Sequence, residues 1–355
     1  MRGTTAPRCL CSYPLSPVPL VVGCIILAMR YSSALAGAAL VLAGFCNGIN
    51  ILMSNDDGFG SGNLRELYKL LKGAGHNVYI VAPALQQSGQ GGRTDFTTEP
   101  ALTGPSQYNL VPAGAPSVGP DPLDSHIWYY NGTPAACTLV GLDYVLPKFA
   151  DFAVPDLVVT GPNYGTNLGP FVWTLSGTAG AAYTATARSI PAIALSASNK
   201  AIAYYDVHGT DSDAYRAAAV SFRVVQAVIS SAPKGKKGKP ILPLGHGLNV
   251  NIPPLFAGNF SRVPVVQTRF TGGAEVDAVV PVPAVPGTFT WSNLRPLAAG
   301  VNECVTGECG LPGETNAVAA GKVAVSLFIV DYTAPLSFES VGVMARLASL
   351  TGWKG

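Results

Sequence analysis

The feature that most constrains the fold is an alternation between short apolar runs and segments with helical spacing, from Ile49 to Ser198. The apolar runs "INILMS", "NVYIVAP", "DLVVTG" and "PAIALSA" have the length and bulk of buried strands. Between them lie "NLRELYKLLKGAG", "GTPAACTLVGLDYVL" and "AGAAYTATAR", which have the spacing or composition of helices. Such alternation predicts an α/β fold with a mostly parallel sheet flanked by helices.

The sequence changes character after Ser198. It continues with one long helical segment, "DAYRAAAVSFRVVQAVISS", and a strand at Leu248 to Ile252. Segments rich in Pro, Val and Thr then favour antiparallel hairpins, and "FESVGVMARLASLTGW" favours a final helix. We therefore expect one domain at 49–355, in which 199–355 is a more divergent part with a β-hairpin and helix extension.

The first 48 residues have the pattern of a leader. Two apolar segments, Pro17 to Met29 and Ser32 to Phe45, are separated by Arg30, and neither reaches the roughly 20 residues of a spanning helix. The second has the charged start and small-residue exit of a secretory signal peptide. We expect Met29 to be the working start, the mature protein to be secreted, and no stable membrane span to remain after leader removal. The alternative is an uncleaved leader that anchors the protein in the secretory pathway.

Cysteine usage and one glycosylation motif fit export. Four of the seven cysteines lie in the leader, and Cys304 and Cys309 in "CVTGEC" can close a small disulfide loop in an oxidising compartment. Cys137 would then be a lone buried thiol. Asn259 in "NFS" is a candidate for N-glycosylation, whereas Pro134 follows the tripeptide at Asn131 and disfavours modification there.

The low charge excludes one class of partner. Only 12% of the residues are charged and the net charge is +2, with no basic stripe. The run "KGKKGK" at 234–239 is the one basic cluster, and its length is typical of a solvated loop. We therefore expect no nucleic-acid polymer as partner.

Polar residues follow three of the predicted strands. Asn55, Asp56 and Asp57 end the first strand, Ser88 lies just past the second, and Asn163 lies just past "DLVVTG". The carboxyl ends of parallel strands meet at one edge of a sheet, where ligands bind. Oxygen donors without Cys or His suit Mg²⁺, Mn²⁺ or Ca²⁺ rather than zinc, and two adjacent carboxylates repel each other unless a cation lies between them.

A second polar motif predicts a phosphate site. Ser176, Gly177 and Thr178 open the helical segment that runs to Arg188, so their backbone N–H groups and hydroxyls form an anion site. A divalent cation on one side and a helix N-terminus on the other is the arrangement that phosphoester hydrolysis needs.

Each motif also has a simpler interpretation. "DDG" is typical of a turn or helix cap. "GPNYGTNLG" is typical of two tight turns, in a segment from Gly161 to Thr178 that we expect to be a loop. A dinucleotide site is the competing binding site, but Gly58, Gly60 and Gly62 have the spacing G-x-G-x-G and no acid ends the second strand. The chain contains neither a G-x-x-x-x-G-K-[ST] loop nor a G-x-S-x-G elbow.

Six motifs in order carry a resemblance to a known family: "ILMSNDDG", "VAPALQQSG", "NGTPAAC", "DLVVTGPNYGTNLG", "LSGTAGAA" and "PAIALS". Together they resemble the stationary-phase survival protein SurE family of metal-dependent 5′(3′)-nucleotidases and acid phosphatases. The resemblance implies a Rossmann-like α/β domain whose C-terminal part extends to a neighbouring subunit, giving homodimers or tetramers.

The resemblance also implies a role for each site residue. One divalent cation, Mg²⁺ or Mn²⁺, would be bound by Asp56, Asp57, Ser88 and Asn163. Asn55, Asn167 and the residues Ser176, Gly177 and Thr178 would line the phosphate site, with Asp56 and Asp57 as the catalytic pair. The loop after Ser88, "GQGGRTDFT", and the C-terminal third depart from the bacterial pattern. The leader is similar to that of the secreted eukaryotic branch.

The expected function is hydrolysis of nucleoside monophosphates or a broader set of phosphate esters, so the expected partners are small-molecule phosphate esters. The first choice of nucleophile is a water activated by the metal, and the second is one of the two carboxylates. Two alternatives remain: a secreted, non-catalytic metal- or ligand-binding protein with the same fold, and a dinucleotide-dependent enzyme.

Overall fold

The computed structural model describes residues 48–232, 240–294 and 297–352. The leader prediction therefore lies outside the described residues, except for Gly48. Within the described part of the chain, no helix has both the length and the apolar character needed to cross a membrane.

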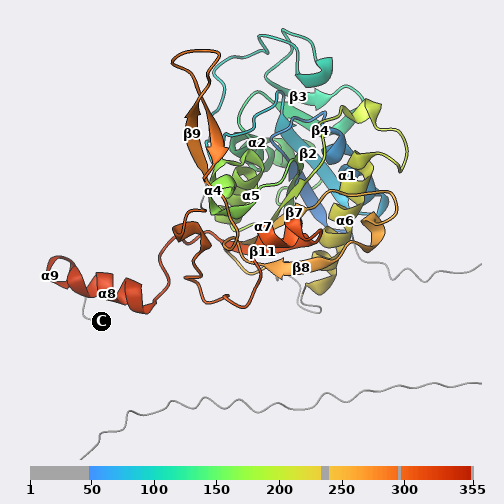
Figure 1. The fold of residues 1–355 in the computed structure, drawn as a ribbon. Helices are drawn as coiled ribbons and strands as arrows, with labels where there is room; N and C mark the ends of the chain where they lie inside the picture. Colours follow the sequence, from blue (N-terminus) through green and yellow to red (C-terminus); the bar gives the residue numbers. More distant parts are fainter. Residues whose placement is uncertain (1–47, 233–239, 295–296, 353–355) are drawn as a thin grey trace, which may run out of the picture. The chain divides into compact units, whose positions relative to one another are not determined.

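Strands and helices alternate through the first half of the chain, as the sequence predicts, and further strands with short helices follow (Figure 1). The strands are β1 Asn50–Ser54, β2 Asn77–Pro83, β3 Val118–Asp121, β4 Asp124–Tyr130, β5 Leu157–Tyr164, β6 Ala192–Ala197, β7 His246–Ile252, β8 Val265–Thr268, β9 Asp277–Pro281, β10 Phe289–Asn293 and β11 Val323–Ile329. The α-helices are α1 Gly62–Gly73, α2 Pro134–Val140, α3 Leu146–Phe149, α4 Gly169–Leu175, α5 Gly177–Ala187, α6 Asp213–Ser231, α7 Glu314–Ala319, α8 Phe338–Arg346 and α9 Ala348–Thr351. Single turns of other helix types are η1 Gln107–Asn109, η2 Gly141–Val145, η3 Tyr204–Asp206, η4 Phe260–Arg262 and η5 Gly300–Asn302.

Nine strands of the described residues form one sheet in the order β3-β4-β2-β1-β5-β6-β7-β11-β8. The six consecutive strands β4-β2-β1-β5-β6-β7 run parallel to one another. Strand β3 is antiparallel to β4, and β11 is antiparallel to β7. The sequence prediction of a mostly parallel sheet flanked by helices is confirmed. The carboxyl ends of β1, β2, β5 and β6 therefore meet at one edge.

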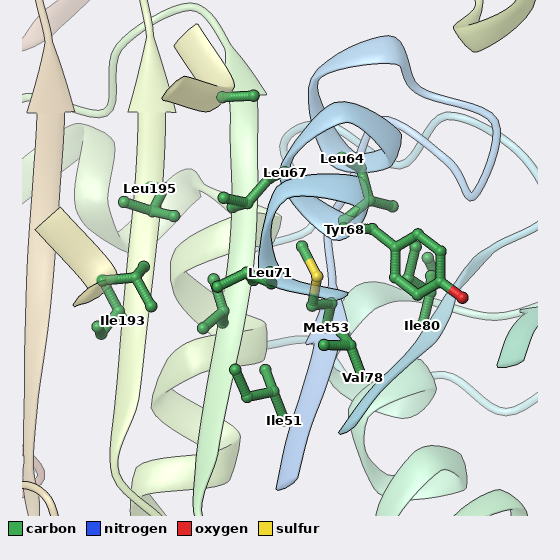
Figure 2. Packing of buried hydrophobic residues seen from close by; sticks show 14 of the residues in the cluster. Ile51, Met53, Leu64, Leu67, Tyr68, Leu71, Val78, Ile80, Ile193 and Leu195 are labelled. Atoms are coloured by element: carbon green, nitrogen blue, oxygen red, sulfur yellow. The ribbon is translucent and has the colours of Figure 1, made fainter. Parts of the chain in front are cut away.

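Helices cover both faces of the sheet because side chains alternate along each strand. Ile51 and Met53 of β1 pack in one apolar cluster with α1 and α6, whereas Leu52 packs in another with α5 and η2. Helix α1 contributes Leu64, Leu67, Tyr68 and Leu71, the spacing of a single buried stripe, which faces Ile51 and Met53 in Figure 2. Each fully buried Leu stabilises the fold by about 1.5–3 kcal/mol, so this stripe holds α1 firmly against β1.

One segment differs from its prediction. The sequence predicts a loop from Gly161 to Thr178, but β5 continues to Tyr164 and helix α4 follows at Gly169–Leu175. Pro170 lies in the first turn of α4, and Trp173 packs its ring 5.2 Å from Phe270 and 4.7 Å from Phe328. Those aromatic partners come from distant parts of the chain, so the local sequence alone does not predict this helix.

The C-terminal third confirms the predicted extension. Strands β9 and β10 form a separate antiparallel hairpin, and α8 and α9 end the described chain. Cys304 and Cys309 form a disulfide, as the sequence predicts, and Cys137 is a buried free thiol. Asn259 is exposed in the turn before η4.

Candidate active site

The two predicted acids lie at the carboxyl end of β1. Asp56 and Asp57 are only 2% and 3% exposed, although they are ionisable and adjacent in sequence. The chain turns directly after them at Gly58, whose φ of 91° favours glycine. Asn55 Nδ2 donates a hydrogen bond of 3.1 Å to the Gly58 carbonyl and stabilises this turn. The turn thus holds both carboxyl groups at the edge of the sheet.

The N-terminus of α5 contacts Asp56. Ser176 is the N-cap residue, and its Oγ accepts a hydrogen bond of 3.1 Å from the Ala179 amide. Thr178 donates its hydroxyl to Asp56 Oδ1 at 2.8 Å and its amide to Asp56 Oδ2 at 3.3 Å. At Gly177 an added Cβ would lie 2.9 Å from the Asp56 Cβ, so this close approach of helix and acid requires glycine. The predicted phosphate motif and the predicted acid are therefore in direct contact.

The carboxyl end of β5 contacts Asp57. The Tyr164 amide donates to Asp57 Oδ2 at 2.9 Å. The preceding residue, Asn163, donates both hydrogens of its side-chain amide, to the Tyr164 carbonyl at 3.0 Å and to the Gly165 carbonyl at 2.9 Å. Asn163 Oδ1 is buried and accepts no hydrogen bond from the described residues. Asn163 thus precedes the residue that bonds Asp57, and its unpartnered amide oxygen is of the kind that a hard cation prefers.

Burial changes the acidity of both carboxyl groups. It raises the pKa of Asp56, although the hydrogen bonds from Thr178 oppose this effect. The pKa of Asp57 is raised well above its usual value, mainly by burial and further by repulsion from the Asp56 charge. A divalent cation between the two would offset both penalties. Among the described residues, no three His, Cys, Asp or Glu side chains gather at a metal-sized site.

Ser88 lies at the margin of this site. The preceding residue, Gln87, donates its amide to the Asp56 carbonyl at 2.7 Å, which ties the loop after β2 to the acidic turn. Ser88 itself is exposed, and its hydroxyl accepts a hydrogen bond from the Gln86 side-chain amide. The structure therefore brings the residue before Ser88 to the acidic turn, but the Ser88 hydroxyl is bonded to Gln86, so its role as a metal ligand stays a prediction.

Asn167 lies in a buried polar network at the end of β6 and β7. Its side-chain amide donates to Ser196 Oγ at 2.7 Å, and its carbonyl accepts from Asn251 Nδ2 at 3.0 Å and Asn249 Nδ2 at 3.2 Å. Asn249 Nδ2 also donates to Glu314 Oε2 at 3.1 Å. The loop that carries Asn167 is thus held by hydrogen bonds to side chains of β6 and β7.

Sequence reasoning missed the supporting part of that network. The signal for Asn249 and Asn251 is their alternation with apolar residues in the buried strand "LNVNI", since a fully buried strand rarely contains two amides without a reason. Glu314 gives no comparable local signal. It is fully buried at the start of α7 and accepts the Gly169 amide at 2.6 Å.

Comparison with known proteins gives the family. The family model described as "Survival protein SurE" matches residues 51–273. An acid phosphatase of Yarrowia lipolytica is 40% identical over 293 residues, which are 80% of each chain. A 5′-nucleotidase SurE of Methanocella arvoryzae is 37% identical over 62% of this chain and 71% of its own length.

A 5′-nucleotidase SurE of Desulfovibrio desulfuricans is 36% identical over 156 residues, so the chain spans only about half, 49%, of that protein. Among solved structures, the crystal structure of the SurE protein from Aquifex aeolicus is similar with a TM-score of 0.56 and 25% identity, covering 84% of this chain and 98% of that one. Because the family model covers more than half of the 355 residues, and the Yarrowia lipolytica relative matches over 80% of both chains, this chain belongs to the survival protein SurE family.

Proposed function

We propose that this protein is a divalent-metal-dependent phosphomonoesterase that acts on nucleoside monophosphates or a broader set of phosphate esters. The names of its relatives, acid phosphatase and 5′-nucleotidase SurE, support the reaction class. The single observation that carries the proposal for this chain is the buried pair Asp56 and Asp57. Asp56 bonds the N-terminus of α5 at Thr178, and Asp57 bonds the amide of Tyr164, the residue after Asn163, whose Oδ1 has no partner among the described residues.

The residues present fit a hard cation. Asp56, Asp57 and Asn163 would bind Mg²⁺ or Mn²⁺, with Ser88 as a fourth ligand once its hydroxyl turns from Gln86. When bound, the cation polarises the phosphoryl group and activates water as the nucleophile. In the proposal the N-terminus of α5 at Ser176 to Thr178 binds the phosphoryl oxygens of the ester, and Asn55 and Asn167 supply further polar groups for it.

The two acids differ in how they are held. Thr178 engages both oxygens of Asp56, so this carboxylate is fixed in orientation. Asp57 accepts the Tyr164 amide at Oδ2 only, and its Oδ1 takes no hydrogen bond from the described residues. Asp57 is therefore the freer ligand, and it is the carboxylate better placed to attack phosphorus if the alternative, covalent route operates.

Phosphate release tests the proposal directly. Protein that starts at Asn47 is assayed with nucleoside monophosphates and p-nitrophenyl phosphate in Mn²⁺, Mg²⁺ or EDTA, beside Asp57→Asn. We expect release that requires metal and falls at least about 10³-fold in the variant, because both a ligand and its charge are lost. The matched control is Asp143→Asn, an exposed acid paired with Arg188, which should keep wild-type activity.

Two results contradict the proposal. Release that persists in EDTA excludes the metal requirement. Absence of release by the wild type with every metal from acid to neutral pH, together with retained Mn²⁺ binding, favours the alternative of a non-catalytic metal-binding protein. Secretion, glycosylation at Asn259 and assembly into dimers or tetramers stay parts of the proposal that separate measurements have to address.

A further inference from the structure

A buried acid outside the acidic pair supports the segment that leads into the phosphate motif. Glu314 is fully buried at the start of α7, which packs on β7 and β11 (Figure 1). Its Oε1 accepts a hydrogen bond of 2.6 Å from the amide of Gly169, the first residue of α4. Helix α4 ends at Leu175, directly before the N-cap Ser176 of α5. Glu314 therefore anchors the first turn of the segment that ends at the predicted phosphate motif.

The other partners of Glu314 come from one polar row across the sheet. Asn249 of β7 lies opposite Ser326 of β11, which lies opposite Thr268 of β8. Ser326 Oγ donates to Glu314 Oε2 at 2.8 Å, and Asn249 Nδ2 donates to the same oxygen at 3.1 Å. The Ser326 and Thr268 hydroxyls are 2.8 Å apart. Together with Gly169, three donors converge on one carboxyl group, which is the arrangement that an ionised acid requires because it can only accept hydrogen bonds.

The same Asn249 amide also holds the loop at Asn167. Its Nδ2 donates to the Asn167 carbonyl at 3.2 Å, beside the bond of 3.0 Å from Asn251 Nδ2. Asn249 Oδ1 is buried and has no hydrogen-bond partner in the part of the chain that the structure describes. A neutral Glu314 has a proton to donate, and this oxygen accepts it once the amide turns over and its two end atoms exchange places. The Asn167 carbonyl then loses one of its two side-chain donors.

No neighbouring charge holds Glu314 in one state. The charged or titratable side chains on the surrounding segments are His246, Arg269, Glu275 and Lys322. Among the described residues, none of the positively charged ones forms an ion pair with Glu314. Burial raises the pKa of Glu314 to about 7, against the effect of its three donors. The carboxyl group therefore changes its charge between weakly acid and neutral pH.

We propose that Glu314 is a positioning residue for the phosphate site, which it holds in place when ionised and loosens when it takes up a proton. It acts through Gly169 and Asn249 on the segment from Asn167 to Ser176. The proposal rests on the function proposed above and deepens it, because it adds regulation of the same site by pH. Binding of phosphate and binding of the proton at Glu314 are then linked, so each weakens the other.

Glu314→Gln tests the proposal, because a glutamine amide offers a donor and an acceptor as a protonated acid does. The KM for p-nitrophenyl phosphate is measured with Mg²⁺ from pH 5 to 8.5 for the variant and the wild type. We expect similar KM values below about pH 5.5 and a KM about tenfold higher in the variant above about pH 8, since one hydrogen bond to the loop is lost. The ratio of the two KM values removes the titration of the ester and of the acidic pair.

Binding of inorganic phosphate, measured by calorimetry with Mg²⁺ present, adds a readout that needs no turnover. A tenfold coupling lowers the pKa of Glu314 by about one unit when phosphate binds. At pH 6.5 the wild type should therefore release about half a proton more than Glu314→Gln on binding phosphate. Titrations in buffers of different ionisation enthalpy give the number of protons released.

Ser326→Ala keeps the test decisive if Glu314→Gln does not fold. The variant removes one donor to the carboxylate, which raises the pKa of Glu314 further. The ratio of its KM to that of the wild type should reach about twofold near pH 7 and return toward one at pH 5 and 8.5. The matched control is Ser221→Ala, which removes a buried hydroxyl on α6 that has no partner among the described residues, and its KM ratio should not change with pH.

A purely structural role for Glu314 gives a different result. A KM ratio of Glu314→Gln to wild type that is constant from pH 5 to 8.5, or equal proton release by the two proteins, would overturn the proposal. If the wild type hydrolyses the ester with metal and the ratio is constant, the phosphatase function stands and the role of Glu314 is wrong. If no ester is hydrolysed but phosphate binding releases the expected excess of protons, the role of Glu314 stands and the phosphatase function is wrong.

Discussion

Burial of Glu314 should lower the free energy of unfolding of this protein as pH rises. The side chain is fully buried and accepts hydrogen bonds from the Gly169 amide at 2.6 Å, Ser326 Oγ at 2.8 Å and Asn249 Nδ2 at 3.1 Å. The described residues place no cationic side chain in an ion pair with it. Burial therefore raises the pKa of Glu314 from 4.5 to about 7, against the effect of its three donors.

The magnitude follows from linkage. Between pH 4.5 and 7 the folded protein holds a proton on Glu314 that the unfolded chain has released, so the free energy of unfolding falls as pH rises through this window. A shift of about 2.5 units corresponds to about 3 kcal/mol. Glu314 thus stabilises the folded state least above pH 7, and the full contribution is recovered below pH 4.5.

The assay is urea unfolding of the protein in EDTA at half-unit steps from pH 4.5 to 8.5, for the wild type and Glu314→Gln. Glutamine has nearly the same volume and does not titrate, so the difference in unfolding free energy between the two proteins should change by about 3 kcal/mol across the window. Taking the difference removes the contributions of Asp56 and Asp57, whose raised pKa values act in the same direction.

Parallel curves for the wild type and Glu314→Gln would refute the reasoning, because they would mean that Glu314 has the same pKa in the folded and unfolded chains. A difference that changes in the opposite direction would mean that the three donors outweigh burial.

Three further predictions concern other parts of the chain. Thr178→Val removes the hydroxyl donor to Asp56 and should weaken Mn²⁺ binding about tenfold in calorimetry. The control Thr184→Val removes a hydroxyl on the same helix that is bonded to the Gly180 carbonyl, and it should leave Mn²⁺ binding unchanged. Equal Mn²⁺ affinities of the two variants would contradict the positioning role of Thr178. Replacing both Cys304 and Cys309 by Ser opens a loop with a sequence separation of 5, so we expect a loss of up to about 2 kcal/mol in unfolding free energy and unchanged phosphate release; a total loss of activity would refute this. Asn259→Gln, expressed in a eukaryotic secretory host, should lose the mass of one glycan, and a mass difference of the substitution alone would exclude glycosylation there.

The sequence predicts the parts of the site that are local. The strand "INILMS" followed by two acids and a glycine predicts both β1 and the buried turn, and Ser176 is the N-cap that its motif predicts. It does not predict what depends on distant contacts. Helix α4 is supported by the packing of Trp173 on Phe270 and Phe328, which the residues of α4 alone do not predict. The Tyr108 ring lies close to Gly60, and the sequence of the loop that carries Tyr108 gives no sign of this contact.

The chemistry of the acidic pair is likewise set by residues far from it in sequence. Asp56 accepts hydrogen bonds from Thr178, which is 122 residues away in the sequence, and Asp57 accepts one from the Tyr164 amide, 107 residues away. These donors are not equivalent, since one residue occupies both oxygens of Asp56 and a single amide occupies one oxygen of Asp57. Two identical side chains that are adjacent at one strand end are thereby made different: Asp56 is fixed through both oxygens, and Asp57 keeps one oxygen without a hydrogen bond from the described residues. That difference depends on the parallel sheet, because only the alignment of β1 beside β5, with α5 starting at the same edge, brings both donors to one turn.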